Sequence, residues 1–104
     1  MATFYTRGGL PVHIKGQATG VKSHWEWSQG VSNFLIIENR DATDKLFVAF
    51  SEDDIDNDRT ITIPAAIGTN GNPARLPVET GGFWIKAEGA NPVDFSAIVF
   101  VRRG

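Results

Sequence analysis

The stretch V-D-F-S-A-I-V-F-V runs from Val93 to Val101 and repeats with a period of two over most of its length. Successive side chains on a β-strand point to opposite faces, so residues two apart line the same face. The pattern predicts a strand with one core face and a second face that begins polar and ends apolar at Ile98 and Phe100. The expected core face consists of Val93, Phe95, Ala97, Val99 and Val101.

Further strand patterns lie on the N-terminal side of this stretch. Some alternate, and others are short runs of aromatic and β-branched residues that are apolar on both faces. Turn residues separate them at nearly even intervals, and no long segment carries a helical apolar stripe free of Gly and Pro. The sequence therefore predicts an all-β fold: a single-domain antiparallel β-sandwich over residues 1–104, jelly-roll-like, with about eight short strands. The clearest of these segments are 21–27, 34–37, 46–50, 60–63 and 83–88, and residues 64–68 are expected to form a short turn.

Composition narrows the function classes. The chain has 104 residues, 41% of them apolar and 21% charged, with a net charge of −2 and no cysteine. A nucleic-acid groove or an anionic membrane surface would need clustered Lys and Arg, so neither partner is expected. The absence of cysteine excludes disulfides and thiolate sites. The N-terminal M-A-T-F-Y-T-R-G-G lacks the apolar run of a secretion signal, so synthesis and folding are expected in the cytoplasm.

The acidic run S-E-D-D-I-D-N-D-R, residues 51–59, holds the candidate metal ligands Asp54, Asp56 and Asp58. Their D-x-D-x-D spacing resembles the opening of a calcium loop. Arg59, however, stands where that loop needs glycine, and Ala65 stands where it needs a bidentate glutamate. The run lies between two predicted strands and is interpreted as a hairpin loop rich in turn residues, with no metal site. A weak surface cation site stays open as the alternative.

No pattern of catalytic residues or of a cofactor site is present. The two histidines, His13 and His24, have neither a nucleophile motif nor a metal-ligand spacing around them, and both are expected to be solvated or hydrogen-bonded. Phosphate-binding glycine loops are also lacking. The sequence predicts that the protein is not an enzyme and has no cofactor.

The three tryptophans separate into two groups. Trp25 and Trp27 share the apolar face of their predicted strand with Val21, which favours packing in the core. Trp84 lies opposite the apolar register of its strand, together with Lys86. Trp84 is therefore expected to be exposed or covered by something outside the sandwich.

Several strands are apolar on both faces, although each sheet of a two-layer sandwich should turn one face to water. A homo-oligomer would shield the second face. The predicted interface contains Trp84, Ile98 and Phe100, together with Leu35 or Ile37. The alternative is that a loop of the same chain, within residues 64–77, folds over that face.

Four segments carry a resemblance to a known group of proteins. They are S-N-F-L-I-I-E-N-R-D-A-T-D-K-L-F-V-A-F, T-I-T-I-P-A, G-G-F-W-I-K-A and V-D-F-S-A-I-V. Together they resemble small β-sandwich proteins encoded in tailed-phage genomes. The resemblance implies a structural role in the virion, with other virion proteins as further partners and no catalytic or binding residues to carry over.

Two function classes follow from these observations. The first is a non-enzymatic structural or assembly protein of a phage virion that self-associates. The second is a carbohydrate-binding β-sandwich module that stacks a glycan on Trp84 and Tyr5. Association with virus particles would support the first class, and glycan binding would support the second.

Overall fold

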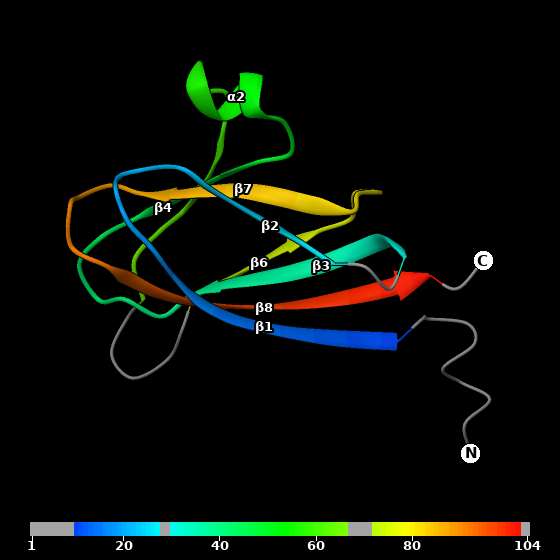
Figure 1. Ribbon diagram of the computed structural model, residues 1–104. Helices are drawn as coiled ribbons and strands as arrows, with labels where there is room; N and C mark the ends of the chain where they lie inside the picture. The colour runs from blue at the N-terminus through cyan, green and yellow to red at the C-terminus, as the bar shows by residue number, and fades with distance from the viewer. Residues whose placement is uncertain (1–9, 28–29, 67–71, 103–104) are drawn as a thin grey trace.

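The computed structural model describes residues 10–27, 30–66 and 72–102, and almost all of its regular structure is β-strand (Figure 1). A single short helix, α2, interrupts the strands in this part of the chain. The elements are β1 (Leu10–Ala18), β2 (Ser23–Glu26), β3 (Val31–Asn39), β4 (Leu46–Ala49), α2 (Glu52–Asp56), β5 (Ile61–Ile63), β6 (Asn72–Leu76), β7 (Gly82–Ala87) and β8 (Val93–Arg102).

The eight strands form two four-stranded antiparallel sheets. Sheet A has the strand order β1-β8-β3-β6, and sheet B has the order β2-β7-β4-β5. The chain changes sheet at every connection except the one from β4 to β5. Such alternation between two sheets is the jelly-roll arrangement. The predicted fold class, an antiparallel jelly-roll-like sandwich, is therefore confirmed.

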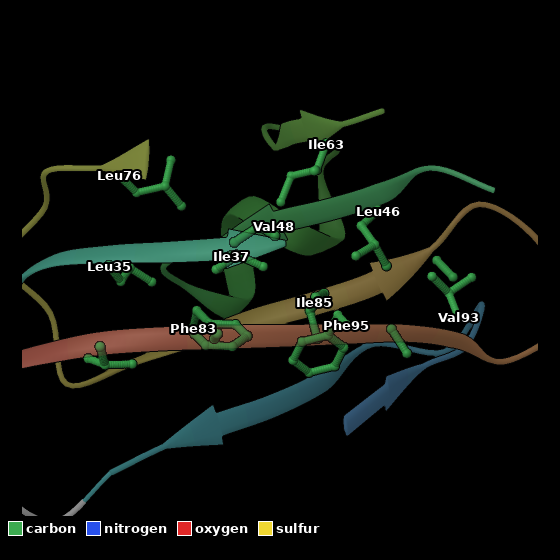
Figure 2. Packing of buried hydrophobic residues seen from close by; sticks show 14 of the residues in the cluster. Leu35, Ile37, Leu46, Val48, Ile63, Leu76, Phe83, Ile85, Val93 and Phe95 are labelled. Carbon is green, nitrogen blue, oxygen red and sulfur yellow. The ribbon is translucent and has the colours of Figure 1, made fainter. Parts of the chain in front are cut away.

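The core lies between the two sheets, where inward-facing residues of both meet (Figure 2). Sheet A contributes every second residue of β3 and β8, and sheet B does the same from β4 and β7. Trp27 belongs to this cluster and Trp25 packs against it, as the sequence predicts. The main side chains of the core are Leu35, Ile37, Leu46, Val48, Phe83, Ile85, Phe95 and Val99.

Two strands and one residue depart from the sequence prediction. The edge strands of sheet A, β1 and β6, were not among the predicted segments, and each contains a proline, Pro11 or Pro73. Proline cannot donate to the ladder and therefore occurs at sheet edges, where it weakens the strand signal in the sequence. Val21 is 75% exposed and lies before β2, because the chain turns there instead of continuing the strand. The turn expected at 64–68 lies partly outside the described residues.

A buried amide ties the two sheets together at one end of the sandwich. Asn39, the last residue of β3, is 0% exposed. Its Nδ2 donates to the carbonyl oxygens of Asp44 (2.9 Å), Ile63 (3.3 Å) and Pro64 (3.1 Å). Its Oδ1 accepts from the amide of Asp41 at 2.8 Å. One side chain therefore satisfies backbone groups from the β3–β4 turn and from the end of β5.

The turn that follows Asn39 is closed by a carboxylate. Asp41 accepts hydrogen bonds from the Asp44 amide (2.8 Å), the Thr43 amide (3.0 Å) and the Thr43 hydroxyl (2.9 Å). These bonds, the one from the Asp44 amide first, hold the pKa of Asp41 below its ordinary value because each favours the charged form. The N-R-D-A-T-D segment is thus a turn in which the Asp41 carboxylate accepts hydrogen bonds from other residues of the same turn.

Candidate functional site

The acidic run forms a capped helix between β4 and β5, where the sequence predicts a hairpin loop. The position of the run is as predicted, but its conformation is different. Ser51 is the N-cap, and its hydroxyl accepts from the Asp54 amide at 3.2 Å. Asp58 follows the helix with a φ of 57°, and the Arg59 amide donates to the Asp54 carbonyl at 2.9 Å. This geometry is a left-handed C-terminal cap.

Local physics explains why the run is rich in carboxylates. Glu52, Asp53 and Asp54 lie in the first turn of α2, where exposed backbone N–H groups favour negative charge. Aspartate also tolerates the left-handed conformation of Asp58 better than most side chains do. A serine followed three residues later by an acidic residue is a signature of a helix N-terminus. That signal was present in S-E-D-D and could have revealed the helix.

The three candidate metal ligands pair with three different basic side chains. Asp54 pairs with Arg59 Nε at 2.8 Å, and Asp56 pairs with Lys22 Nζ at 2.6 Å. Asp58 lies 3.3 Å from Lys86 Nζ. Within residues 10–27, 30–66 and 72–102, no group of three or more His, Asp or Glu side chains is arranged to hold a metal ion. Each of the three carboxylates thus has a basic partner within the chain.

The ion pairs shift the pKa values in the directions expected for mutual stabilisation. Hydrogen bonds from Arg59 and then from Ser51 hold the pKa of Asp54 below its ordinary value. Asp56 first and Glu52 second raise the pKa of Lys22. These side chains are exposed or half-buried at the surface, and each such pair adds little to stability because water and salt screen it.

Helix α2 lies on the outer side of sheet B, above β7 and β4 in the view of Figure 1. Ile55 of this helix is only 1% exposed, although it does not belong to the main core cluster. Lys86 on β7 reaches the Ile55 carbonyl oxygen at 3.4 Å. The second face of sheet B is therefore partly covered by the chain itself. In the described part of the chain, residues 52–56 form this cover. The sequence also allowed a loop within residues 64–77 in this role.

Trp84 lies on this outer face of sheet B, as its register predicts, and is half-buried. His24 of the neighbouring strand stacks on the indole, with the ring centroids 4.6 Å apart and the planes at 18°. Lys22 Nζ lies 5.5 Å from the ring centroid of Trp84 and also binds the carboxylates of α2. The indole is thus contacted by its own chain, which weighs against its use as a glycan platform. The second platform residue, Tyr5, lies outside the described residues.

The histidines show no catalytic arrangement in the described part of the chain. His13 and His24 are both exposed, on the outer faces of β1 and β2. No side-chain hydrogen bond joins either of them to a serine or to a carboxylate within these residues. Their separation on two different sheets also keeps them from acting as one site.

The outer face of sheet A carries an apolar patch on its two central strands. Phe34 and Ile36 of β3 lie directly opposite Phe100 and Ile98 of β8. The two phenyl rings are in contact, with centroids 5.9 Å apart. All four side chains are half-buried, and we refer to them as the A-face patch. The sequence predicted Ile98 and Phe100 for this position.

The β3 partners in the patch correct one part of the prediction. Leu35 or Ile37 was expected at the interface, but both are 0% exposed and belong to the core. The outward residues of β3 are Phe34 and Ile36. When a short run is apolar at every position, the sequence alone does not show which alternate set faces inward. Asn39, at the end of the same strand, is buried on the same face as Leu35. Because its side chain is polar, it indicates this inward face only once its hydrogen-bond partners are known.

Polar residues border the patch. His13 of β1 and Arg75 of β6 flank the row formed by Ile98 and Ile36. The next row along the sheet contains Ser96 and Glu38, and Glu38 pairs with Arg40. Polar residues therefore border the half of the patch that contains Ile36 and Ile98, whereas Phe100 is paired with Pro11 of β1.

The predicted interface residues do not share one surface. Ile98 and Phe100 lie on the outer face of sheet A, whereas Trp84 lies on the outer face of sheet B, on the other side of the sandwich. A single flat contact with one neighbouring molecule cannot include all three.

Among the described residues, no helix is long and apolar enough to cross a lipid bilayer. Comparison with protein-family models, with curated proteins and with solved structures finds no match to this chain. The resemblance to small phage proteins therefore stays a prediction.

Proposed function

We propose that this chain is a non-enzymatic structural module of a phage virion that self-associates through the A-face patch. One observation carries the proposal. Phe34, Ile36, Ile98 and Phe100 form a continuous apolar surface at the centre of a sheet. Apolar residues grouped in this way on an outer face are characteristic of protein–protein contacts, whereas single exposed apolar residues are ordinary.

The two sheets differ in how their outer faces are covered. The one described helix packs on sheet B, and all eight described strands belong to the sheets themselves. No described helix or strand is left to cover sheet A (Figure 1). A second copy of the chain is the economical partner, because an identical patch supplies a matching apolar surface.

The form of the contact follows from the edges of sheet A. Both edge strands contain a proline, Pro11 in β1 and Pro73 in β6, and proline removes an N–H that edge-to-edge pairing would use. Association by the face is therefore favoured over extension of the sheet. Two identical faces that meet generate a closed dimer with two-fold symmetry.

The phage part of the proposal rests on the sequence resemblance alone. The jelly-roll arrangement occurs in viral capsid, lectin and other domains, so the fold does not select among these functions. The direct test is whether the protein co-sediments with capsids or tails of the phage that encodes it. Its absence from purified particles would contradict this part of the proposal and leave the self-association untouched.

Self-association is tested by sedimentation velocity of the parent protein and of Phe100→Asp. We expect the parent to be a dimer at micromolar concentration and the variant to be a monomer, because a charge in a desolvated contact opposes association. A matched control is Val21→Asp, which places the same charge at a residue that is 75% exposed and outside both sheets. Far-ultraviolet circular dichroism should stay β-rich in all three proteins. A monomeric parent would refute the proposal.

A further inference from the structure

A groove lies on the outer face of sheet B, beside the helix that covers part of that face. Its volume is about 470 Å³, within the range of about 300–1,000 Å³ that is usual for small-molecule sites. It lies on the opposite side of the sandwich from the A-face patch. Its lining includes Phe47, Asp58, Thr60, Thr62, Lys86 and Glu88.

One aromatic ring, that of Phe47, lines the groove. Phe47 is paired with Lys86 of β7 on one side and with Thr62 of β5 on the other, so all three side chains project from the outer face of the sheet. Phe47 is only half-buried, although it is a large apolar residue on a strand whose other residues are buried. The ring can therefore offer an apolar surface to a ligand.

The rest of the lining is polar and has hydrogen-bonding capacity to spare. Within the described residues, no hydrogen bond is found for the hydroxyl groups of Thr60 and Thr62. Glu88 uses one carboxylate oxygen, Oε1, for the Lys45 amide at 3.1 Å. Lys86 holds Asp58 at 3.3 Å and presents its ammonium group at the wall of the groove. The groove thus combines hydrogen-bond donors and acceptors with one aromatic ring.

The charges select the class of ligand. Asp58 and Glu88 oppose an anionic ligand, and the Lys86 ammonium opposes a cationic one. A neutral ligand that carries many hydroxyl groups and has one apolar face fits both the charges and the ring. We propose that this groove binds a neutral sugar, with a C–H face of the pyranose on Phe47 and its hydroxyl groups on Thr60, Thr62 and Glu88.

The groove is a different location from the platform that the sequence suggested. Trp84 is stacked by His24 and approached by Lys22, so its surroundings are already provided by the chain. Phe47 has no ring partner among the aromatic pairs of the described residues. A sugar would supply the contact that the fold leaves open there.

The test is a titration of the ¹⁵N-labelled protein with glucose, galactose, mannose and N-acetylglucosamine, followed by amide chemical shifts, together with binding of the same protein to a glycan array. At least one sugar should shift amides around residues 47, 60–62 and 86–88, with millimolar affinity for a monosaccharide. Phe47→Ala should weaken binding by about tenfold, which corresponds to ~1.4 kcal/mol.

Thr62→Val keeps the size of an exposed side chain while it removes a hydroxyl, and it should also weaken binding. The matched control is Ser96→Ala, a hydroxyl deletion on the outer face of sheet A, which should bind sugar like the parent. Absence of binding to every sugar in both formats, or shifts centred on residue 84, would overturn the proposal. Saturable binding of free arginine in place of sugars would assign the groove to cations and overturn it as well. None of these outcomes depends on whether the protein dimerises.

Discussion

At the scale of single residues, Asn39 does more for this fold than its small polar side chain suggests. It is fully buried, and it hydrogen-bonds to three carbonyl oxygens and one amide in the β3–β4 turn and at the end of β5. Buried backbone groups without a partner are costly, so this amide is required for the turn after β3 and for the end of β5 to close against each other.

We predict that Asn39→Ala lowers the free energy of unfolding by at least about 2 kcal/mol, because several buried backbone groups lose their partner together. Urea unfolding followed by circular dichroism measures the change. Asn33→Ala is the matched control, since Asn33 lies on the same strand but is exposed, and it should change stability by less than about 0.5 kcal/mol. Equal effects of the two substitutions would contradict the role given to Asn39.

At the scale of elements, α2 illustrates how a very short helix is maintained. Five residues are too few for a helix to be stable alone. The Ser51 cap, the acidic first turn and the left-handed Asp58 satisfy its two ends, and Ile55 anchors it to sheet B. The ion pairs to Lys22 and Lys86 lie at the surface and set its position more than its stability.

Anchoring by Ile55 leads to a prediction. Ile55→Ala should lower the free energy of unfolding by about 2 kcal/mol or more, the usual cost of truncating a buried isoleucine. Ile61→Ala is the matched control, because Ile61 is 38% exposed on the neighbouring edge strand, and it should cost only about 0.5 kcal/mol. Thermal melts of the parent and both variants, with and without calcium, provide the measurement.

A calcium-dependent rise in melting temperature would show that the Asp54, Asp56 and Asp58 run binds a cation after all.

At the scale of the whole molecule, the sandwich has two outer faces with different properties. One carries the A-face patch, and the other carries α2, Trp84 and the groove. This difference separates two modes of assembly. Contact between two A-face patches gives a closed dimer, whereas contact of the A-face patch of one copy with the Trp84 face of the next gives a ring or a filament.

Substitutions on the two faces distinguish these modes. If the dimer uses the A-face patch alone, Trp84→Ala should sediment as a dimer, while Phe100→Asp sediments as a monomer. If both folded variants are monomeric, the A-face patch of one copy contacts the Trp84 face of the next, and Trp84 belongs to the interface, where the sequence predicts it. Sedimentation velocity over a range of concentrations measures the association, and circular dichroism confirms the fold of each variant.

Local patterns in the sequence were sufficient to predict which residues of β7 and β8 face inward. Phe83, Ile85 and Ala87 are buried as expected, and so are the alternate residues from Val93 to Val101. The reason is covalent: the strand geometry sends neighbouring side chains to opposite faces whatever the rest of the chain does. The same reasoning failed at 34–37. Every position there is apolar, so the pattern does not show which alternate residues face inward.

Only the tertiary structure decided which strands share a sheet, and therefore which outward residues share a surface. Ile98 and Trp84 look equivalent in the sequence, since each points away from the core of its own strand. The strand order places one on sheet A and the other on sheet B. Pairing between distant strands uses backbone groups that are the same in every residue other than proline, so single-strand patterns do not encode the partner. The partner is selected when both sheets close on a common core, and that selection places the A-face patch and the groove on opposite sides of the molecule.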